Sequence, residues 1–155
     1  MIMVKIMFVC HGNICRSPMA EFYMKHIVEK AGLEDEIFVA SSATSLEEIG
    51  NDTHYGTKAV LSLHNIPFCP RKAVRFTRKD YEKFDLILLM DKNNQRNIKY
   101  IVPEDSDDKI RLLLNFAGED ASIADPWYTG EFETTYRDVK RGCNALLQYI
   151  KDELL

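Results

Sequence analysis

A cysteine and an arginine stand six residues apart near the amino terminus, in the segment FVCHGNICRSP, residues 8–18. A thiolate is a strong nucleophile, and a nearby cation or helix amino terminus lowers the pKa of a cysteine to roughly 3.5–7.5. A guanidinium can grip two oxygens of a tetrahedral anion at once. Cys10 and Arg16 therefore predict a nucleophile and an anion clamp on either side of a five-residue loop.

The residues of this loop are suited to wrap around an anion. Their consecutive backbone N–H groups can turn inward toward it. Gly12 permits close approach, and Asn13 tolerates a left-handed backbone. Ser17 can cap the helix that starts near Pro18, and it can also donate its hydroxyl to the Cys10 sulfur. The assembly fits a phosphate monoester dianion, which Cys10 would attack in line to give a phosphocysteine intermediate.

Such a reaction needs an acid to protonate the leaving oxygen, and the distal segment ADPWYTGEF, residues 124–132, offers one. Asp125 precedes a proline that holds it in a stiff, non-helical turn. Trp127 and Tyr128 have apolar faces and polar tips, which suit them to flank an aromatic ring. Packing against the sheet is their alternative role. Asp91 also ends a predicted strand, and Asp-Pro turns are common without catalysis, so Asp91 is a rival acid.

The apolar patterning predicts the elements that position these groups. Strands are predicted at residues 4–10, 37–42, 84–91 and 109–116, and helices at 17–32, 53–63, 92–100 and 132–154. This alternation predicts one doubly wound α/β domain over residues 1–155, with a mostly parallel sheet. In such a sheet, ligands bind beyond the carboxyl ends of the strands, at a topological switch point. Cys10 ends the first strand, so its loop is in the right place for a site.

Composition excludes several classes of protein. A formal net charge of −4 gives no bulk electrostatic case for nucleic acid or an anionic membrane. No apolar stretch approaches the length of a transmembrane span, and the amino terminus is too short and strand-like for a signal peptide. The four cysteines and four histidines lack the spacing of metal ligands, so neither a metal nor another cofactor is expected. Free thiols in a cytoplasmic protein are the expectation.

The sequence resembles the low-molecular-weight protein tyrosine phosphatases over most of its length. VCHGNICRSPMAE matches the family's phosphate loop, C-x5-R-[ST]-P, and DPWYTGEFETTY matches its acid loop. SSATSLEEIGN and FDLILLMD match its second-strand loop and its third strand. The resemblance implies a four-stranded parallel sheet flanked by helices, no metal, and hydrolysis of phosphotyrosine in proteins or peptides.

Carried over by position, the resemblance implies a role for each site residue. It makes Cys10 the nucleophile, Arg16 the phosphate clamp and Asp125 the general acid. It also implies a phosphate loop and supporting network made of His11, Gly12, Asn13, Ile14, Cys15, Ser17 and Ser41, with the His11 side chain directed away from the anion. Cys15 resembles a second family cysteine that forms a reversible disulfide with Cys10, although a packing role is as well supported. The resemblance also marks Tyr128 as a candidate site of phosphorylation.

Two positions depart from the family's pattern. Glu47, in TSLEEIG, stands where an aromatic side chain often lines the substrate pocket. A carboxylate in the pocket wall predicts weaker binding of phosphotyrosine peptides or a shift toward basic flanks, and a solvated loop edge is the alternative for Glu47 and Glu48. In CPRKAVRF, Arg71 or Lys72 replaces a family histidine, which leaves that position's part in the network open.

The remaining charged and sulfur-containing residues have simpler interpretations. A basic cluster is interpreted as a solvated face, with a docking patch for acidic partners as the alternative; it comprises Arg71, Lys72, Arg75, Arg78 and Lys79. Cys69 and Cys143 are interpreted as structural.

We therefore predict a monomeric, cytoplasmic protein-tyrosine-phosphatase that binds phosphotyrosine-containing proteins or peptides and phosphate-like anions. One alternative is a thioredoxin-coupled arsenate reductase of the same fold, which would need further cysteines close together. Cys69 and Cys143 are far apart in the sequence and do not form such a pair. The second alternative is a non-catalytic phosphate-binding module, against which the intact Cys10, Arg16 and Asp125 argue.

Overall fold

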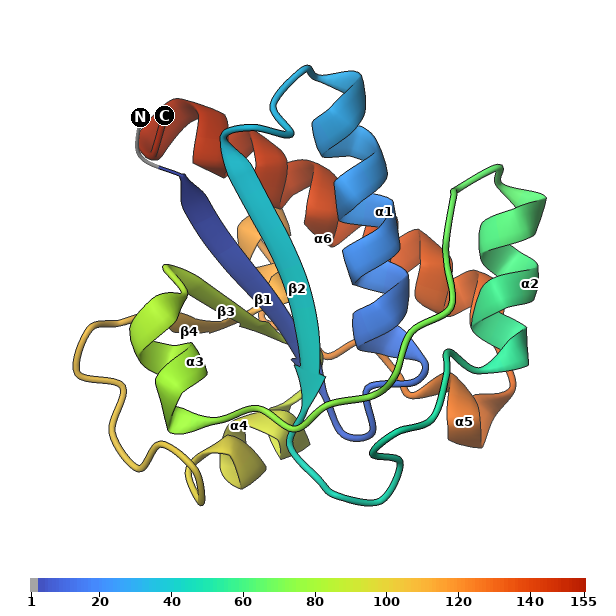
Figure 1. Ribbon diagram of the computed structural model, residues 1–155, viewed down its shortest axis with the longest axis horizontal. Coiled ribbons are helices and arrows are strands. Elements are labelled where there is room, and N and C mark those ends of the chain that lie inside the picture. The colour runs from blue at the N-terminus through green and yellow to red at the C-terminus, as the bar shows by residue number, and fades with distance from the viewer. Residues whose placement is uncertain (1–2) are drawn as a thin grey trace.

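Residues 3–155, which are those that the computed structural model describes, form a four-stranded parallel sheet flanked by helices (Figure 1). Its strands lie in the order β2-β1-β3-β4 and comprise β1 (Val4–Cys10), β2 (Ile37–Ala43), β3 (Leu86–Leu89) and β4 (Ile110–Leu112). The predicted doubly wound α/β fold is confirmed. Because β2 and β3 lie on opposite sides of β1, the topological switch point falls at the carboxyl ends of β1 and β3.

Helices cover both faces of the sheet (Figure 1). Helices α1 and α6 lie on one face, while α3 and α4 lie on the other. The helices are α1 (Arg16–Lys30), α2 (Tyr55–Leu63), α3 (Arg78–Lys83), α4 (Lys92–Ile98), α5 (Pro126–Thr129) and α6 (Phe132–Glu153), with a 3₁₀ helix η1 (Leu113–Ala117).

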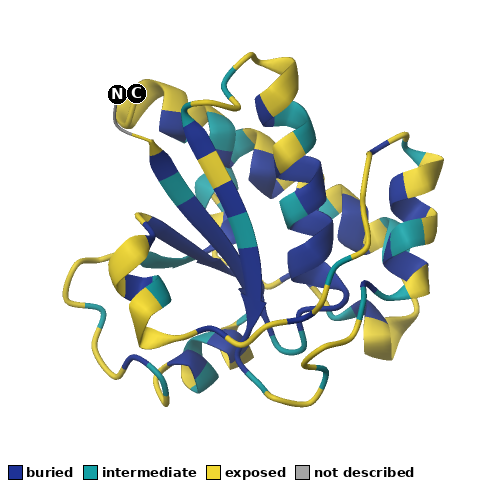
Figure 2. Ribbon diagram, viewed as in Figure 1, coloured by how far each residue is buried: buried dark blue, intermediate teal, exposed yellow. Residues whose placement is uncertain are grey.

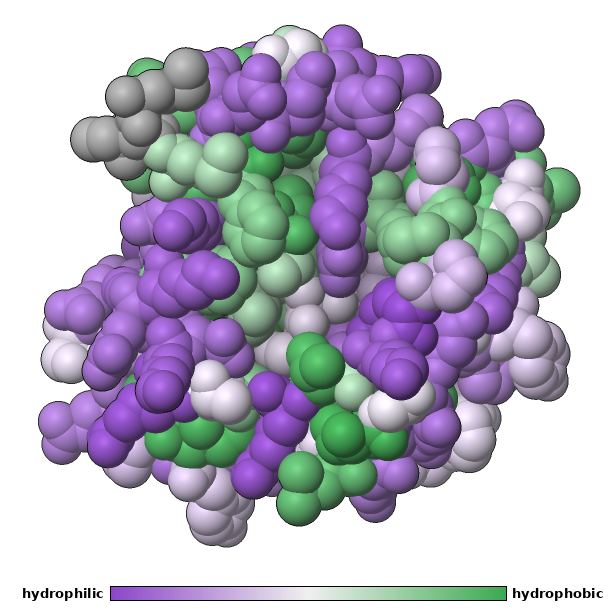
Figure 3. Space-filling view, viewed as in Figure 1, coloured by the Kyte–Doolittle hydropathy of each residue, from purple (hydrophilic) through white to green (hydrophobic). Residues whose placement is uncertain are grey.

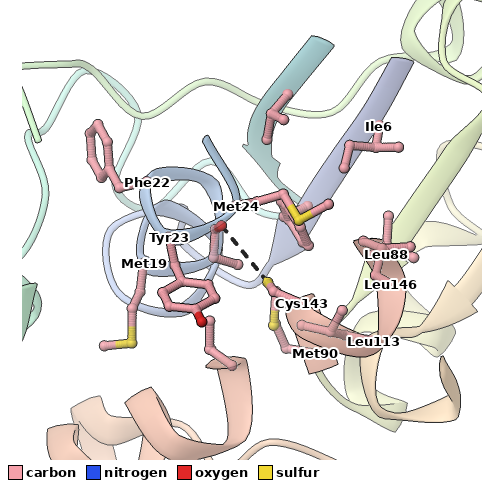
Figure 4. Packing of buried hydrophobic residues seen from close by; sticks show 14 of the residues in the cluster. Ile6, Met19, Phe22, Tyr23, Met24, Leu88, Met90, Leu113, Cys143 and Leu146 are labelled. Carbon is pink, nitrogen blue, oxygen red and sulfur yellow. Dashed lines mark hydrogen bonds between the residues drawn. The ribbon is translucent and has the colours of Figure 1, made fainter. Parts of the chain in front are cut away.

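The central strand β1 is buried on both faces, as its continuous apolar run predicts. Ile6 and Phe8 pack on the α1 side, while Met7 and Val9 pack on the α3 side. Figure 2 shows that the strand is buried along most of its length, and Figure 4 shows Ile6 in the cluster with residues of α1 and α6. Side chains alternate along a strand, so Cys10 follows Ile6 and Phe8 onto the α1 face. The two-residue period of β1 thus directs the sulfur toward the amino terminus of α1.

The fourth predicted strand is shorter than its apolar run indicated. Of residues 109–116, only Ile110–Leu112 pair as β4, and Leu113–Ala117 form η1 instead. β4 is an edge strand with β3 as its partner, so the chain can leave the sheet here without exposing apolar side chains. Leu113 and Leu114 remain buried on the α1 side.

Capping residues shorten other predicted elements. The strand predicted at 84–91 pairs only over Leu86–Leu89, and Asp91 caps α4 by accepting a 2.8 Å hydrogen bond from the Asn94 N–H. The helix predicted at 53–63 begins at Tyr55, because Nδ1 of His54 accepts a bond from the Gly56 N–H.

Three local predictions were wrong or incomplete. Ser17 does not cap α1, because the helix begins at Arg16 and Cys15 is the capping residue. The sequence pattern also missed the short helix α3, which begins with a capping box between Thr77 and Asp80. The stiff turn predicted at Asp125 is non-helical at that residue alone, since the next four residues form α5.

Polar side chains cover most of the face seen in Figure 3. Apolar side chains gather over β2 and along the lower edge of the molecule in this view. Within residues 3–155, no helix combines the length and the apolar character needed to cross a membrane.

A glycine lets η1 pack closely on α6. A Cβ built on Gly142 would lie 2.6 Å from Cγ of Leu113, whose side chain is fully buried. We expect Gly142→Ala to lower the free energy of unfolding by about 1–3 kcal/mol, because overpacking forces neighbouring side chains to move. Chemical denaturation measures this change. Lys140→Ala, on the exposed side of the same helix, is the control; equal stability of the two variants would contradict the packing argument.

Candidate active site

The loop between β1 and α1 surrounds a buried sulfur. Cys10 is 2% exposed, and its Sγ lies 3.3 Å from the Asn13 backbone nitrogen and 3.0 Å from Ser17 Oγ. Ser17 Oγ accepts a 2.8 Å bond from the side-chain amide of Asn13, so its own hydroxyl hydrogen can point at the sulfur or at the Ser42 carbonyl, which is 3.5 Å away. The predicted Ser17–Cys10 contact is therefore present, and the Asn13 N–H and the Ser17 hydroxyl are both placed to donate to the sulfur.

Asn13 connects the loop to the rest of the fold. It adopts the left-handed backbone that was predicted, with φ of 58°. Its side chain is fully buried and donates to Ser41 Oγ at 2.9 Å as well as to Ser17. Ser41 in turn donates to Glu21 on α1 at 2.5 Å. The predicted network of Asn13, Ser17 and Ser41 is thus assembled, and Glu21 is a member that sequence reasoning missed.

Arg71 completes the network from behind. Its guanidinium donates to the Asn13 side-chain oxygen, which also accepts a 3.2 Å bond from the Val74 N–H. Burial holds the pKa of Arg71 below its ordinary value, although the negative charges of Glu21 and Cys10 act in the opposite direction. Of the two residues left open by the sequence, Arg71 contacts the loop and Lys72 is exposed.

Arg16 is almost completely buried at the base of the site, with 2% exposure. Its Nη1 donates to Asp91 at 2.6 Å and to the Ile123 carbonyl at 2.9 Å, while Nη2 lies 3.4 Å from Asp125. Burial alone would lower the pKa of Arg16. The negative charges of Cys10, Asp91 and Asp125 outweigh burial and raise that pKa above its ordinary value. The guanidinium therefore stays charged.

The two candidate acids occupy different environments. Asp125 caps α5, where its Oδ1 accepts a 3.0 Å bond from the Trp127 N–H, and it lines a cavity of about 360 Å³. Asp91 does not line that cavity, because one oxygen binds Arg16 and the other caps α4. Of the two candidate acids, Asp125 is therefore the one that can reach a ligand in the cavity.

The cavity brings the predicted loop and wall residues together. It is lined by Cys10, His11, Gly12, Ile14, Cys15, Arg16, Glu47, Glu48, Asp125, Trp127 and Tyr128. The side chain of His11 is bonded to Glu47 at the rim. Asn13, Ser17 and Ser41 lie behind the loop and do not line the cavity.

The second cysteine of the loop differs from the first. Burial, followed by the negative charges of Cys10 and Asp125, raises the pKa of Cys15 to about 12. Cys15 is a free thiol here, and its pKa keeps it protonated near neutral pH. Cys143 is fully buried on the α1 face, where its Sγ lies 3.9 Å from the Ala20 carbonyl (Figure 4), whereas Cys69 is exposed.

His54 is a site neighbour that the sequence did not single out. Its ring stacks on Phe132, with centroids 5.1 Å apart, and meets the edge of Trp127 at 5.5 Å. Its backbone N–H donates to the Ile14 carbonyl at 2.8 Å. His54 thereby links the phosphate-loop segment to the Asp125 segment. The signal in the sequence was the position of His54 just before a helix that begins with Tyr-Gly-Thr. This position indicates a helix-capping residue, but it does not reveal the aromatic contacts of the ring.

The fold and this loop together define an α/β protein with a cysteine–arginine loop at the carboxyl edge of its sheet. The sequence model of the family described as low molecular weight phosphotyrosine protein phosphatase matches residues 5–154. The chain therefore belongs to that family, and its predicted membership is confirmed.

Individual relatives agree with this assignment. The low molecular weight protein-tyrosine-phosphatase YfkJ of Bacillus subtilis is 36% identical over 153 residues, which cover 97% of this chain and 98% of the relative. The crystal structure of YfkJ matches with a TM-score of 0.93, covering 99% of this chain and 98% of the other. PtpA of Staphylococcus aureus is 40% identical over 148 residues, covering 96% and 94%. DARP, a Drosophila arginine phosphatase, is 29% identical with a TM-score of 0.87, covering 97% and 99%.

Removing the Arg71 guanidinium tests its part in the loop network. We expect Arg71→Met to lower the free energy of unfolding by about 1–3 kcal/mol, because the buried Asn13 oxygen loses a charged donor. Binding of inorganic phosphate, measured by calorimetry, should weaken in parallel, since Asn13 also holds the loop toward Cys10. Lys72→Met, at the exposed neighbouring position, is the matched control. If the two variants behave alike, Arg71 has no special role in the loop.

Proposed function

We propose that this chain hydrolyses phosphotyrosine and small aryl phosphates through a phosphocysteine on Cys10. The observation that supports this most strongly is the convergence of Cys10, Arg16 and Asp125 on one cavity at the sheet's switch point. Membership of the phosphatase family supports the same activity. The Cys10 sulfur, the Arg16 guanidinium and the Asp125 carboxyl then serve as nucleophile, phosphate clamp and general acid.

In the first step, the phosphate group binds within the loop, where backbone N–H groups and Arg16 hold its oxygens. The Cys10 thiolate attacks phosphorus as the bond from phosphorus to the phenolic oxygen breaks. Asp125 gives its proton to that leaving oxygen, so the phenol departs neutral. The products are phosphocysteine, a free phenol and the Asp125 carboxylate.

In the second step, the same carboxylate takes a proton from water, whose oxygen attacks phosphorus. The bond from phosphorus to sulfur breaks, which releases inorganic phosphate and restores the Cys10 thiolate. Asp125 is again protonated, so protons and charges balance over the cycle. The pKa of about 12 at Cys15 keeps that thiol protonated near neutral pH, which argues against Cys15 as the nucleophile.

The cavity walls favour an aryl phosphate over the alternatives. Ile14, Trp127 and Tyr128 offer apolar surface for a phenyl ring, whereas the DARP relative is described as an arginine phosphatase. A thioredoxin-coupled arsenate reductase would have to pass a disulfide outward. The fully buried Cys143 is badly placed for such a relay. Cytoplasmic location and a monomeric state stay predictions from the sequence.

Two variants test the mechanism. Cys10→Ser should abolish turnover of aryl phosphates while inorganic phosphate still binds, because a serine hydroxyl is not ionised near neutral pH. Asp125→Asn should lower kcat by about 10²–10⁴ for a poor leaving group such as the phenol of phosphotyrosine. The loss should be smaller for 4-nitrophenyl phosphate, whose leaving group departs without a proton.

Asp91→Asn is the matched control for the acid. It loosens Arg16, so any loss should be of similar size for good and poor leaving groups. Unchanged hydrolysis by Cys10→Ser would refute the nucleophile. A leaving-group dependence in Asp91→Asn instead of Asp125→Asn would show that the acid is Asp91. Faster release of phosphate from phosphoarginine than from phosphotyrosine would refute the substrate class.

A further inference from the structure

The mouth of the cavity carries an excess of negative charge. Glu47 and Glu48 line it in addition to the proposed acid Asp125, while Arg16 at its base is buried and already bonded to carboxylates. A site for a phosphate dianion gains nothing from carboxylates at its entrance, because like charges repel the ligand. The rim charge fits a substrate that also carries positive charge.

The two glutamates are held over the phosphate loop. Glu47 is bonded to His11, although two-thirds of its side chain remains exposed. Glu48 accepts a 2.6 Å bond from the Asn51 side chain, and its Cγ lies 3.3 Å from the position that a Cβ on Gly12 would occupy. Both glutamates therefore line the cavity beside His11 and Gly12 of the phosphate loop.

Exposed aromatic rings from the α5 segment also line the cavity. Trp127 is 56% exposed and Tyr128 is 82% exposed. Aromatic faces attract ammonium and guanidinium groups, so these rings favour the same sign of charge as the glutamates. A lysine or arginine that reaches the mouth would meet carboxylates from the β2–α2 loop and aromatic rings from α5.

We propose that Glu47 and Glu48 determine specificity by selecting phosphotyrosine segments with lysine or arginine beside the phosphotyrosine. This inference rests on the proposed phosphotyrosine hydrolysis and adds the charge of the substrate's flanking residues. Residues next to phosphotyrosine emerge at the mouth when the phosphate is bound at the base, so they meet the two carboxylates directly. Free aryl phosphates have no flanking cation and experience only the repulsion.

The test compares short peptides that carry one phosphotyrosine with arginine, glutamine or glutamate on both sides. For the unmodified protein, kcat/KM should be highest with arginine and lowest with glutamate. Glu47→Gln and Glu48→Gln should each reduce the arginine-over-glutamate ratio by about two- to fivefold, the size expected of an exposed ion pair. Raising the salt from about 0.05 M to 0.5 M should also reduce the ratio, because screening weakens exposed charges.

The direction of the KM changes separates charge recognition from damage to the fold. Each glutamine variant should raise KM for the arginine-flanked peptide and lower KM for 4-nitrophenyl phosphate, and a merely weakened site would raise both. Glu34→Gln is the matched control, because Glu34 is exposed in the turn between α1 and β2, at the opposite end of the sheet from the site (Figure 1). It should leave every ratio unchanged.

Binding to Cys10→Ser distinguishes failure of this inference from failure of the proposed function. Equal Kd values of that variant for arginine- and glutamate-flanked peptides, with normal phosphate release by the unmodified protein, would overturn the specificity proposal alone. No phosphate release from any peptide or aryl phosphate by the unmodified protein would overturn the proposed function and this proposal together. Tighter binding of the arginine-flanked peptide, lost in the Glu47 and Glu48 variants, would support the proposal.

Discussion

The burial of one guanidinium constrains the whole carboxyl edge of the sheet. A buried charge costs several kcal/mol unless partners compensate for it. Arg16 has such partners in Asp91, the Ile123 carbonyl and Asp125, which come from separate segments after β3 and before α5. The compensation of this charge therefore brings together the segments that the proposed chemistry needs. Asp91 makes the short contact and anchors the guanidinium, while the longer contact leaves Asp125 beside the cavity.

A second layer of polar contacts fixes the loop above that charge. Asn13 joins the sulfur's neighbour Ser17 to Ser41 on β2 and to Arg71 in the segment before α3. All of these contacts lie behind the cavity, so they hold the loop's shape without occupying the place of a ligand. The loop is thus organised in advance by the fold, which reduces the ordering that binding a phosphate would require. The charged rim lies outside this layer, where sequence changes alter substrate choice without disturbing the loop.

The sequence predicted most of the fold because its signals were local and strong. The apolar runs of β1 and β2, the long amphipathic helix α6 and the Cys10–Arg16 loop all carried recognisable patterns. The end of β4 could not be predicted, since an apolar run does not reveal whether a strand has partners on both sides. Glu21 and His54 were not assigned to the site, and the choice between Arg71 and Lys72 stayed open. These residues join the site through tertiary contacts, and no spacing in the sequence encodes those contacts.

The central claim is that phosphate is transferred to the buried sulfur of Cys10. The most direct measurement is acid quenching of Asp125→Asn during turnover of a radiolabelled aryl phosphate with a good leaving group, followed by mass spectrometry of the protein. That variant retains the first step and slows the second, so the account predicts near-stoichiometric label on Cys10 and none on Cys10→Ser. Absence of covalent phosphate, or its attachment to another residue, would contradict the account.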